Sequence, residues 1–223
     1  MTLKIDRFPH AVYDQDNRLG YLLDYYPYDS TRGGTLSPHQ WRYESWSSQV
    51  LDYKEGGKPA IEFFVKPILS LIHYSLNSLF YDSAYLIPVP SSLAHDDPAY
   101  STVPYQRGSK DRKNRDDRNT VFCNLIAAED TKFRVADILS REESKPEKET
   151  WSAKRHAKSM AIRGYGIAAV QDFSGAFILI DDIITHGGTI QGARKVLEDH
   201  FSKATVVSLA LGHSKDPTQF NPL

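Results

Sequence analysis

The stretch FILIDDIITHGGT, residues 177–189, contains the pattern that decides the expected fold. Its first four residues are apolar and predict a buried strand. Two carboxylates, Asp181 and Asp182, follow at the carboxyl end of that strand, which is where open α/β sheets bind their ligands. A turn then leads into a helix that begins at Gly188. The stretch therefore predicts a strand, an acid pair and a helix start in direct succession.

The turn from Thr185 to Thr189 has the composition of a phosphate-binding loop. Its two glycines allow the backbone to approach an anion closely, and the N-terminus of the helix contributes about half a positive charge. The stretch predicts a site for a ribose 5-phosphate, with the phosphate held by Thr185, His186, Gly187, Gly188 and Thr189. His186 either points to solvent or adds a donor to the phosphate.

Residues 177–189 resemble the motif with which type I phosphoribosyltransferases bind phosphoribosyl pyrophosphate (PRPP). His186 is the one notable departure, because the family usually has a small residue there. The resemblance implies that Asp181 and Asp182 are catalytic and hold the ribose 2- and 3-hydroxyls, one of them through Mg²⁺. It implies a Mg²⁺-assisted reaction in which a nitrogen nucleophile displaces pyrophosphate from PRPP through an oxocarbenium-like transition state.

The segment DSAYLIPVP, residues 82–90, resembles a strand and loop of the ComF-like branch of this family, named for competence proteins of bacterial DNA uptake. The resemblance implies that Pro90 and Ser91, in the loop after this strand, contact the pyrophosphate of PRPP. Residues 118–127 keep the leading Arg118 and the terminal Leu-Ile-Ala of a helix of this branch, but they lack its Gly-Phe-Asn-Gln. The cysteine-rich module of the branch is absent, so the chain is expected to be a divergent relative.

The rest of the chain alternates between helix and strand patterns, which is typical of a parallel sheet covered on both faces. The expected elements are a helix over 58–79 with a kink or break at Pro67, a strand over 84–90, a helix over 119–129, a strand near 133–139, a helix over 147–160, a strand over 176–181 and a strand over 204–211. Residues 58–223 are therefore expected to form a doubly wound α/β domain of the phosphoribosyltransferase kind.

The N-terminal residues 1–57 have a different texture, rich in Tyr and Trp and broken by turn residues. Short aromatic segments of this kind predict β-strands and loops. We expect a β-rich cap on the main body, which would serve as the hood that selects the acceptor base. A partner-binding surface is the alternative, since Tyr and Trp favour interfaces.

Residues 94–118 form the expected mobile loop of the domain. Six basic side chains lie in its second half: Arg107, Lys110, Arg112, Lys113, Arg115 and Arg118. Such a loop either stays a solvated surface segment or closes over the pyrophosphate as a lid that neutralises the leaving group. Arg118 is the candidate catalytic residue among them. Arg155 and Lys158, three positions apart on an expected helix, are the next candidates.

The composition restricts the class of protein. The 223 residues carry 27 Lys and Arg against 28 Asp and Glu, a formal charge of −1, which argues against a general nucleic-acid clamp. The single cysteine, Cys123, excludes an intrachain disulfide and a multi-cysteine zinc module. No apolar run approaches the roughly 20 residues of a membrane span, and the N-terminus lacks the apolar core of a signal peptide. A cytoplasmic location is expected.

Three functional classes stay open at this level. The chain is a phosphoribosyltransferase, or a regulator that senses PRPP or a nucleotide without catalysis, or an effector linked to nucleic acid in DNA uptake or defence. The expected partner is a small ribose-phosphate ligand. A homo-oligomer, a nucleic-acid partner and a protein partner all stay open, and no pattern indicates the acceptor base.

Overall fold

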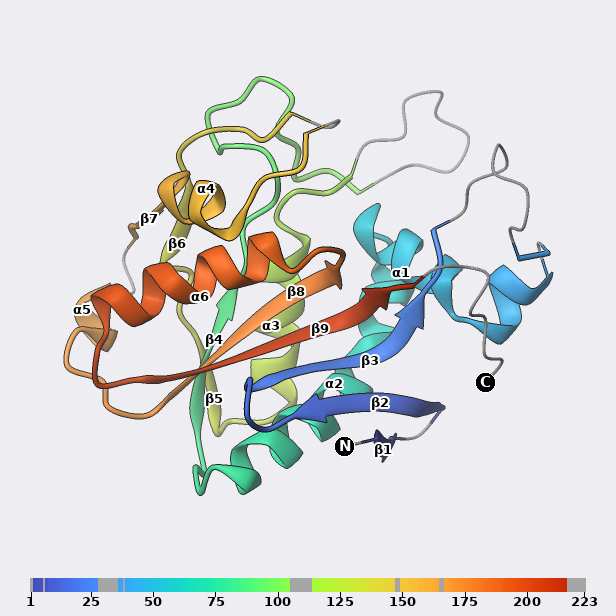
Figure 1. Ribbon diagram of the computed structural model, residues 1–223, viewed down its shortest axis with the longest axis horizontal. Helices are drawn as coiled ribbons and strands as arrows, with labels where there is room; N and C mark the ends of the chain where they lie inside the picture. The colour runs from blue at the N-terminus through green and yellow to red at the C-terminus, as the bar shows by residue number, and fades with distance from the viewer. Residues whose placement is uncertain are drawn as a thin grey trace.

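The computed structural model describes residues 2–5, 7–27, 36–37, 39–104, 114–146, 149–164 and 167–215. These residues build a sheet of seven strands in the order β1-β2-β3-β9-β8-β4-β5, in which the pairs from β3 to β5 are all parallel (Figure 1). The strands are β1 (Thr2–Ile5), β2 (Phe8–Asp14), β3 (Leu19–Tyr25), β4 (Ala84–Pro88), β5 (Phe133–Val135), β8 (Ala176–Ile184) and β9 (Thr205–Ser214). A mostly parallel α/β fold was expected and is confirmed.

Helices cover both faces of the sheet because its central strands are apolar at consecutive positions. In β8, Ile178 and Ile180 belong to one buried cluster, whereas Phe177 and Leu179 belong to another. The first cluster lies under α1 (Ser47–Lys54), α2 (Lys58–Ser78) and α3 (Arg118–Glu129), and the second lies under α5 (Ile167–Val170) and α6 (Gly188–His200). Figure 1 shows α6 in front of the sheet and α2 and α3 behind it. This arrangement is compatible with a doubly wound fold.

A smaller antiparallel pair lies beyond the edge of the main sheet. It consists of β6 (Leu139–Arg141) and β7 (Met160–Ile162), and α4 (Ala153–Lys158) precedes β7 and packs on α6. The strand expected near 133–139 is therefore two strands, because the chain leaves the sheet after Ala136, whose N–H donates to the carbonyl of Leu86. The helix expected over 147–160 is only the short α4, and residues 147–148 lie outside the described part of the chain.

The N-terminal segment is rich in β-structure, as expected, but its strands are not a separate cap. β3 runs parallel to β9, with Leu19 opposite Ser208, and β2 and β1 continue the same sheet in antiparallel fashion. A π-helical turn (Gln40–Glu44) and α1 then lead back across the sheet. Four aromatic residues of this segment, Phe8, Tyr13, Tyr26 and Tyr53, are buried in the core, so packing accounts for part of the aromatic-rich composition.

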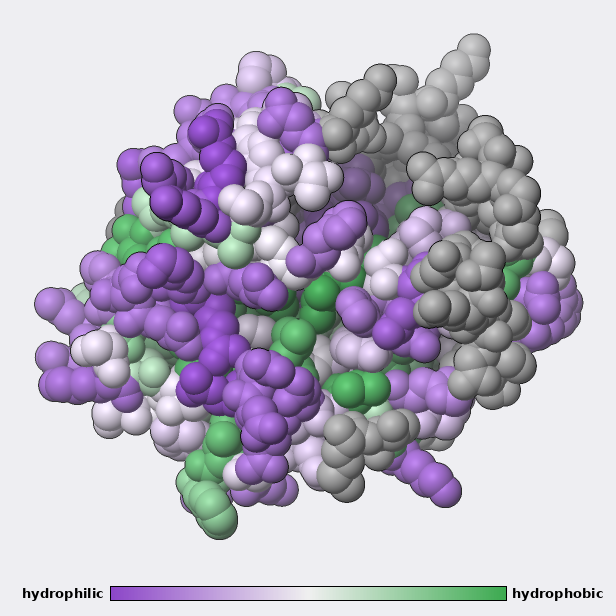
Figure 2. Space-filling view, in the orientation of Figure 1, coloured by the Kyte–Doolittle hydropathy of each residue, from purple (hydrophilic) through white to green (hydrophobic). Residues whose placement is uncertain are grey.

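Helix α2 continues through Pro67, so of the two predicted outcomes, a kink or a break, the break does not occur. Its nine fully buried residues hold it against the sheet, which offsets the loss of one backbone hydrogen bond at the proline. Gly57 precedes the helix, and Pro59 lies in its first turn, where the missing N–H costs no helical hydrogen bond. Within the described residues, no helix has the length and apolar character needed to cross a membrane. Figure 2 shows hydrophilic side chains over α6 and hydrophobic ones beside it, where this face of the sheet carries no helix.

Candidate functional site

The two segments singled out in the sequence lie side by side at the carboxyl ends of neighbouring strands. β4 pairs with β8 up to Pro88 and Ile180, and the N–H of Val89 donates to the carbonyl of Ile180 (2.9 Å). The loop that contains Pro90 and Ser91 therefore begins beside Asp181. Polar groups at this edge of a parallel sheet face the usual ligand site of α/β folds.

The acid pair lies inside β8 rather than at its tip. The sequence predicted a strand ending at Asp181, but pairing with β9 continues to Ile184, which is opposite His213. Successive side chains of a strand point to opposite faces, so Asp181 and Asp182 leave the sheet on different sides. Each is only 6% exposed. The pair does not present two free carboxylates to one side of the sheet.

Arg118 is the partner of Asp182. It is the first residue of α3, and its Nε donates to Asp182 Oδ2 (2.8 Å) while its Nη2 contacts the same oxygen. Its Nη1 donates to the carbonyl of Arg115 (3.0 Å). Both side chains of the Arg118–Asp182 pair are 8% exposed. Arg118 is thus a buried residue that holds the acid pair, and in this conformation it is not part of a lid.

The two carboxyls have opposite electrostatic environments. Burial and then the neighbouring charge of Asp182 raise the pKa of Asp181 to about 7. Burial also opposes ionisation of Asp182, but Arg118 and then Lys54 outweigh it and lower the pKa of that carboxyl. The pair therefore combines a carboxylate fixed in its charged form with a carboxyl that gains or loses a proton near neutral pH.

Sequence reasoning missed the residues that hold the loop after β4. The hydroxyl of Tyr53 donates to Asn119 Oδ1 (2.8 Å), and Asn119 Nδ2 donates to the carbonyl of Val89 (2.8 Å). Next to Tyr53, at the end of α1, the positive charge of Lys54 acts on both acids. It contributes to the lowered pKa of Asp182 and partly offsets the raised pKa of Asp181. The N-terminal segment thus contributes to the site through α1. No local pattern marks these residues, because their roles depend on contacts between distant elements.

The loop from Thr185 to Thr189 has the backbone expected of a helix start. Gly187 has a left-handed conformation, with φ of 72°, and its carbonyl accepts the first helical hydrogen bond, from Gln191 N (2.9 Å). No side chain caps α6. The N–H groups of its first turn therefore have no side-chain cap among the described residues, which suits a bound anion. Thr185 and His186 are exposed, and Thr189 is partly buried.

Gly188 also has a packing role that the sequence did not predict. A Cβ atom at this position would lie 2.7 Å from the carbonyl oxygen of Trp151 and 3.2 Å from His156 Cδ2. Gly192, one turn later, would meet His156 Cβ at 2.6 Å. These glycines are explained by the close packing of the segment around α4 on α6. Gly187 is the glycine of the loop whose conformation itself requires it.

Of the other basic candidates, Arg115 and Arg155 form ion pairs with acids outside the pair Asp181 and Asp182. Arg115 forms a bidentate pair with Asp117, and its N–H donates to the carbonyl of Lys54 (2.9 Å). Arg155 pairs with Glu143 and lies over the ring of Trp151 (4.8 Å), and Lys158 is exposed. Arg107, Lys110, Arg112 and Lys113 lie outside the described residues.

Arg141, at the end of β6, is the second buried arginine near the site, and it is 4% exposed. Its Nε donates to the carbonyl of Ser91, and its Nη1 donates to Ser159 Oγ (3.0 Å). The Ser91 hydroxyl bonds within its own loop, to Leu93. Arg141 therefore ties the loop after β4 to the turn that follows α4.

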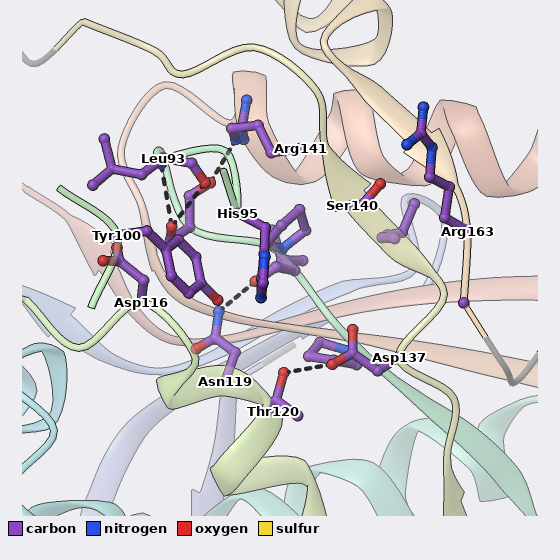
Figure 3. Close-up of a pocket in the computed structure, with 16 residues that line it drawn as sticks. Leu93, His95, Tyr100, Asp116, Asn119, Thr120, Asp137, Ser140, Arg141 and Arg163 are labelled. Atoms are coloured by element: carbon purple, nitrogen blue, oxygen red, sulfur yellow. Dashed lines mark hydrogen bonds between the residues drawn. The ribbon is translucent and has the colours of Figure 1, made fainter. Parts of the chain in front are cut away.

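A cavity of about 210 Å³ lies behind this loop, and Figure 3 shows its lining. It does not include the acid pair or the loop from Thr185 to Thr189; of the predicted site residues it takes only Pro90 and Ser91. This cavity is therefore next to the predicted ribose-phosphate site and not within it.

The described residues contain no group of three or more His, Cys, Asp or Glu side chains that could hold a metal ion. Asp182 already bonds Arg118, and Asp181 lies on the other side of the strand. The acid pair therefore does not fit a preformed Mg²⁺ site, and we derive no step through a protein-bound metal. In comparisons with known proteins, neither a family model nor a curated sequence matches this chain.

Proposed function

We propose that the chain is a phosphoribosyltransferase-like protein that binds PRPP, or a nucleotide with a ribose 5-phosphate, at the carboxyl end of β8. The uncapped start of α6 would take the 5-phosphate, through the backbone of Gly187, Gly188 and Thr189 and the side chains of Thr185 and His186. Asp181 would bind a ribose hydroxyl. Pyrophosphate would then extend toward Pro90 and Ser91, and Mg²⁺ would enter as the counter-ion of PRPP.

One observation carries this proposal: the pairing of β4 with β8. The hydrogen bond from Val89 N to Ile180 O joins β8, which carries the acid pair and leads to the start of α6, to the segment that leads into the proline-containing loop. A sugar with phosphate groups at both ends needs these three elements in this order. The buried carboxyl of Asp181 suits a sugar hydroxyl, because a carboxyl with a pKa of about 7 both donates and accepts hydrogen bonds near neutral pH.

The activity that follows is transfer of the phosphoribosyl group to a nitrogen nucleophile with release of pyrophosphate. The protein would contribute positioning and charge stabilisation, because an oxocarbenium-like transition state needs little from a nucleophilic side chain. Asp182 would act through the fixed negative charge that Arg118 maintains.

A titration of the full chain with PRPP and Mg²⁺, followed by a pyrophosphate-release assay over a panel of nucleobases, tests the proposal. Asp181→Asn should weaken PRPP binding but leave inorganic phosphate binding nearly unchanged, because only the ribose contact is lost. Asp172→Asn, which alters an exposed acid away from the site, is the matched control. Equal weakening of PRPP and phosphate by Asp181→Asn would contradict the ribose assignment.

A second candidate, a sensor that binds PRPP or a nucleotide without catalysis, is favoured by the commitment of Arg118 to Asp182. A transferase needs a cation that meets the departing pyrophosphate, and this buried arginine already has a carboxylate partner. Tight PRPP binding without pyrophosphate release with any base would favour the sensor. Release with one base would favour the transferase.

A further inference from the structure

Arg141 carries a buried positive charge without a negative partner in hydrogen-bond contact. The two acceptors of its guanidinium, the carbonyl of Ser91 and the hydroxyl of Ser159, are both neutral. Its Nη2 is buried and has no hydrogen-bond partner among the residues that the structure describes. Buried charges in proteins are normally paired, and an unmade hydrogen bond to a charged group is costly. This arginine therefore lacks one anionic oxygen.

Arg141 lines two neighbouring cavities, from which an anion would approach its guanidinium. Arg141 lines the cavity of about 210 Å³, and a second, more open cavity of about 320 Å³ shares it together with His95 and Arg163. Burial lowers the pKa of Arg141 to about 10, while the charge of Asp181 partly restores it. The arginine remains charged at neutral pH.

The other charged groups of the cavity are already engaged. Asp116 accepts a hydrogen bond from Ser101 N (2.9 Å), and Asp137 accepts one from the hydroxyl of Thr120 (2.9 Å). Arg163 pairs with Glu142 and is 67% exposed in its side chain. In Figure 3 both acids lie away from Arg141. They would repel an anion at their own end and so direct it to the arginine.

We propose that Arg141 is the centre of an anion-binding site in this cavity, separate from the acid pair, for a phosphate or carboxylate group. Two sources share this chemistry. If the proposed function holds, the pyrophosphate end of PRPP reaches Arg141 past Ser91, since the loop that Arg141 holds begins beside Asp181. The second source is a separate small organic acid, whose apolar body would lie against Leu93, Tyr100 and Leu139.

Calorimetric titration of the full chain with inorganic pyrophosphate and with benzoate tests the site and separates its sources. Arg141→Gln keeps an amide donor near Ser91 but removes the charge, and it should weaken the anion that binds by about tenfold or more, the loss of one charge-assisted hydrogen bond. Arg163→Gln lines the same cavity and is the matched control, with an expected change below about twofold. Arg141-dependent binding of either anion supports the site and identifies its source. Binding of neither anion, or binding of both that is insensitive to Arg141→Gln, overturns it.

A crystal structure of the wild-type chain with pyrophosphate gives an answer even if Arg141→Gln does not fold. A ligand oxygen within hydrogen-bond distance of Arg141 Nη2 is expected with pyrophosphate or, in a second crystal, with benzoate, and the absence of either anion from Arg141 in both crystals would overturn the inference. Titration with ribose 5-phosphate, which has no pyrophosphate group, distinguishes a failure of this inference from a failure of the proposed function. Its affinity should not change in Arg141→Gln. If ribose 5-phosphate fails to bind while pyrophosphate binds through Arg141, the proposed function fails and the anion site stands.

Discussion

The Arg118–Asp182 pair should show strong energetic coupling, because both side chains are 8% exposed and share a well-aligned hydrogen bond of 2.8 Å. Arg118→Met would leave Asp182 charged and buried beside Asp181, and Asp182→Asn would leave Arg118 charged and buried. Removal of one partner of a buried pair costs about 3–5 kcal/mol. The double variant removes both charges, so it should cost far less than the sum of the two single changes.

The measurement is a double-mutant cycle by urea unfolding at pH 8, followed by far-ultraviolet circular dichroism. We expect a coupling energy of about 2–3 kcal/mol, at the upper end for residues in contact. The penalty of Arg118→Met should be smaller at pH 5 than at pH 8, because without the guanidinium the two carboxyls are freer to take up a proton. A coupling below about 0.5 kcal/mol, as for exposed pairs, would refute a structural role for Arg118 and favour its expected role in a lid.

Three further predictions concern single residues. Gly188→Ala should lower the free energy of unfolding by about 1–3 kcal/mol, since its Cβ would lie 2.7 Å from a backbone carbonyl oxygen; a thermal melt that matches wild type would contradict this packing. Phe80→Gly should stabilise the chain by up to about 1 kcal/mol, because Phe80 is 95% exposed with φ of 60° at the end of α2, where glycine is favoured; a lower urea midpoint would show that the phenyl ring has a hidden contact. Because the pKa of Asp181 is raised in the folded chain, from 3.8 to about 7, the folded state holds this proton more tightly than the unfolded state, so wild type should lose stability as pH rises through this interval. Asp181→Asn should lack that loss, and identical pH profiles of unfolding for the two chains would exclude the raised pKa.

The histidine beneath α6 must be separated from this pH effect. Burial, then Arg141 and Lys145, lower the pKa of His156 to about 4, so this residue destabilises the fold as pH falls from its ordinary value of 6.5. Its contribution is opposite in sign to that of Asp181 over the same range. The difference between wild type and Asp181→Asn cancels the histidine contribution, because both chains contain it.

The local sequence determined the central strand, the acid pair and the helix start at Gly188. These predictions were confirmed in element type because each depends on neighbours within a few residues: four apolar residues in succession fit a strand buried on both faces, and a glycine pair fits a helix start. The boundaries were less accurate. β8 extends to Ile184 because β9 runs beside it, and residues 177–189 alone do not determine the length of that partner strand.

Only the tertiary structure decided where the N-terminal strands and the basic residues lie. Leu19 pairs with Ser208, although most of the chain lies between them in sequence. Arg118 contacts Asp182, which lies 64 positions later. No local pattern specifies such contacts, because they depend on which surfaces the folded sheet brings together. The same holds for Arg141: only the packing of Ser91 and Ser159 around it shows a buried guanidinium with one donor unused among the described residues.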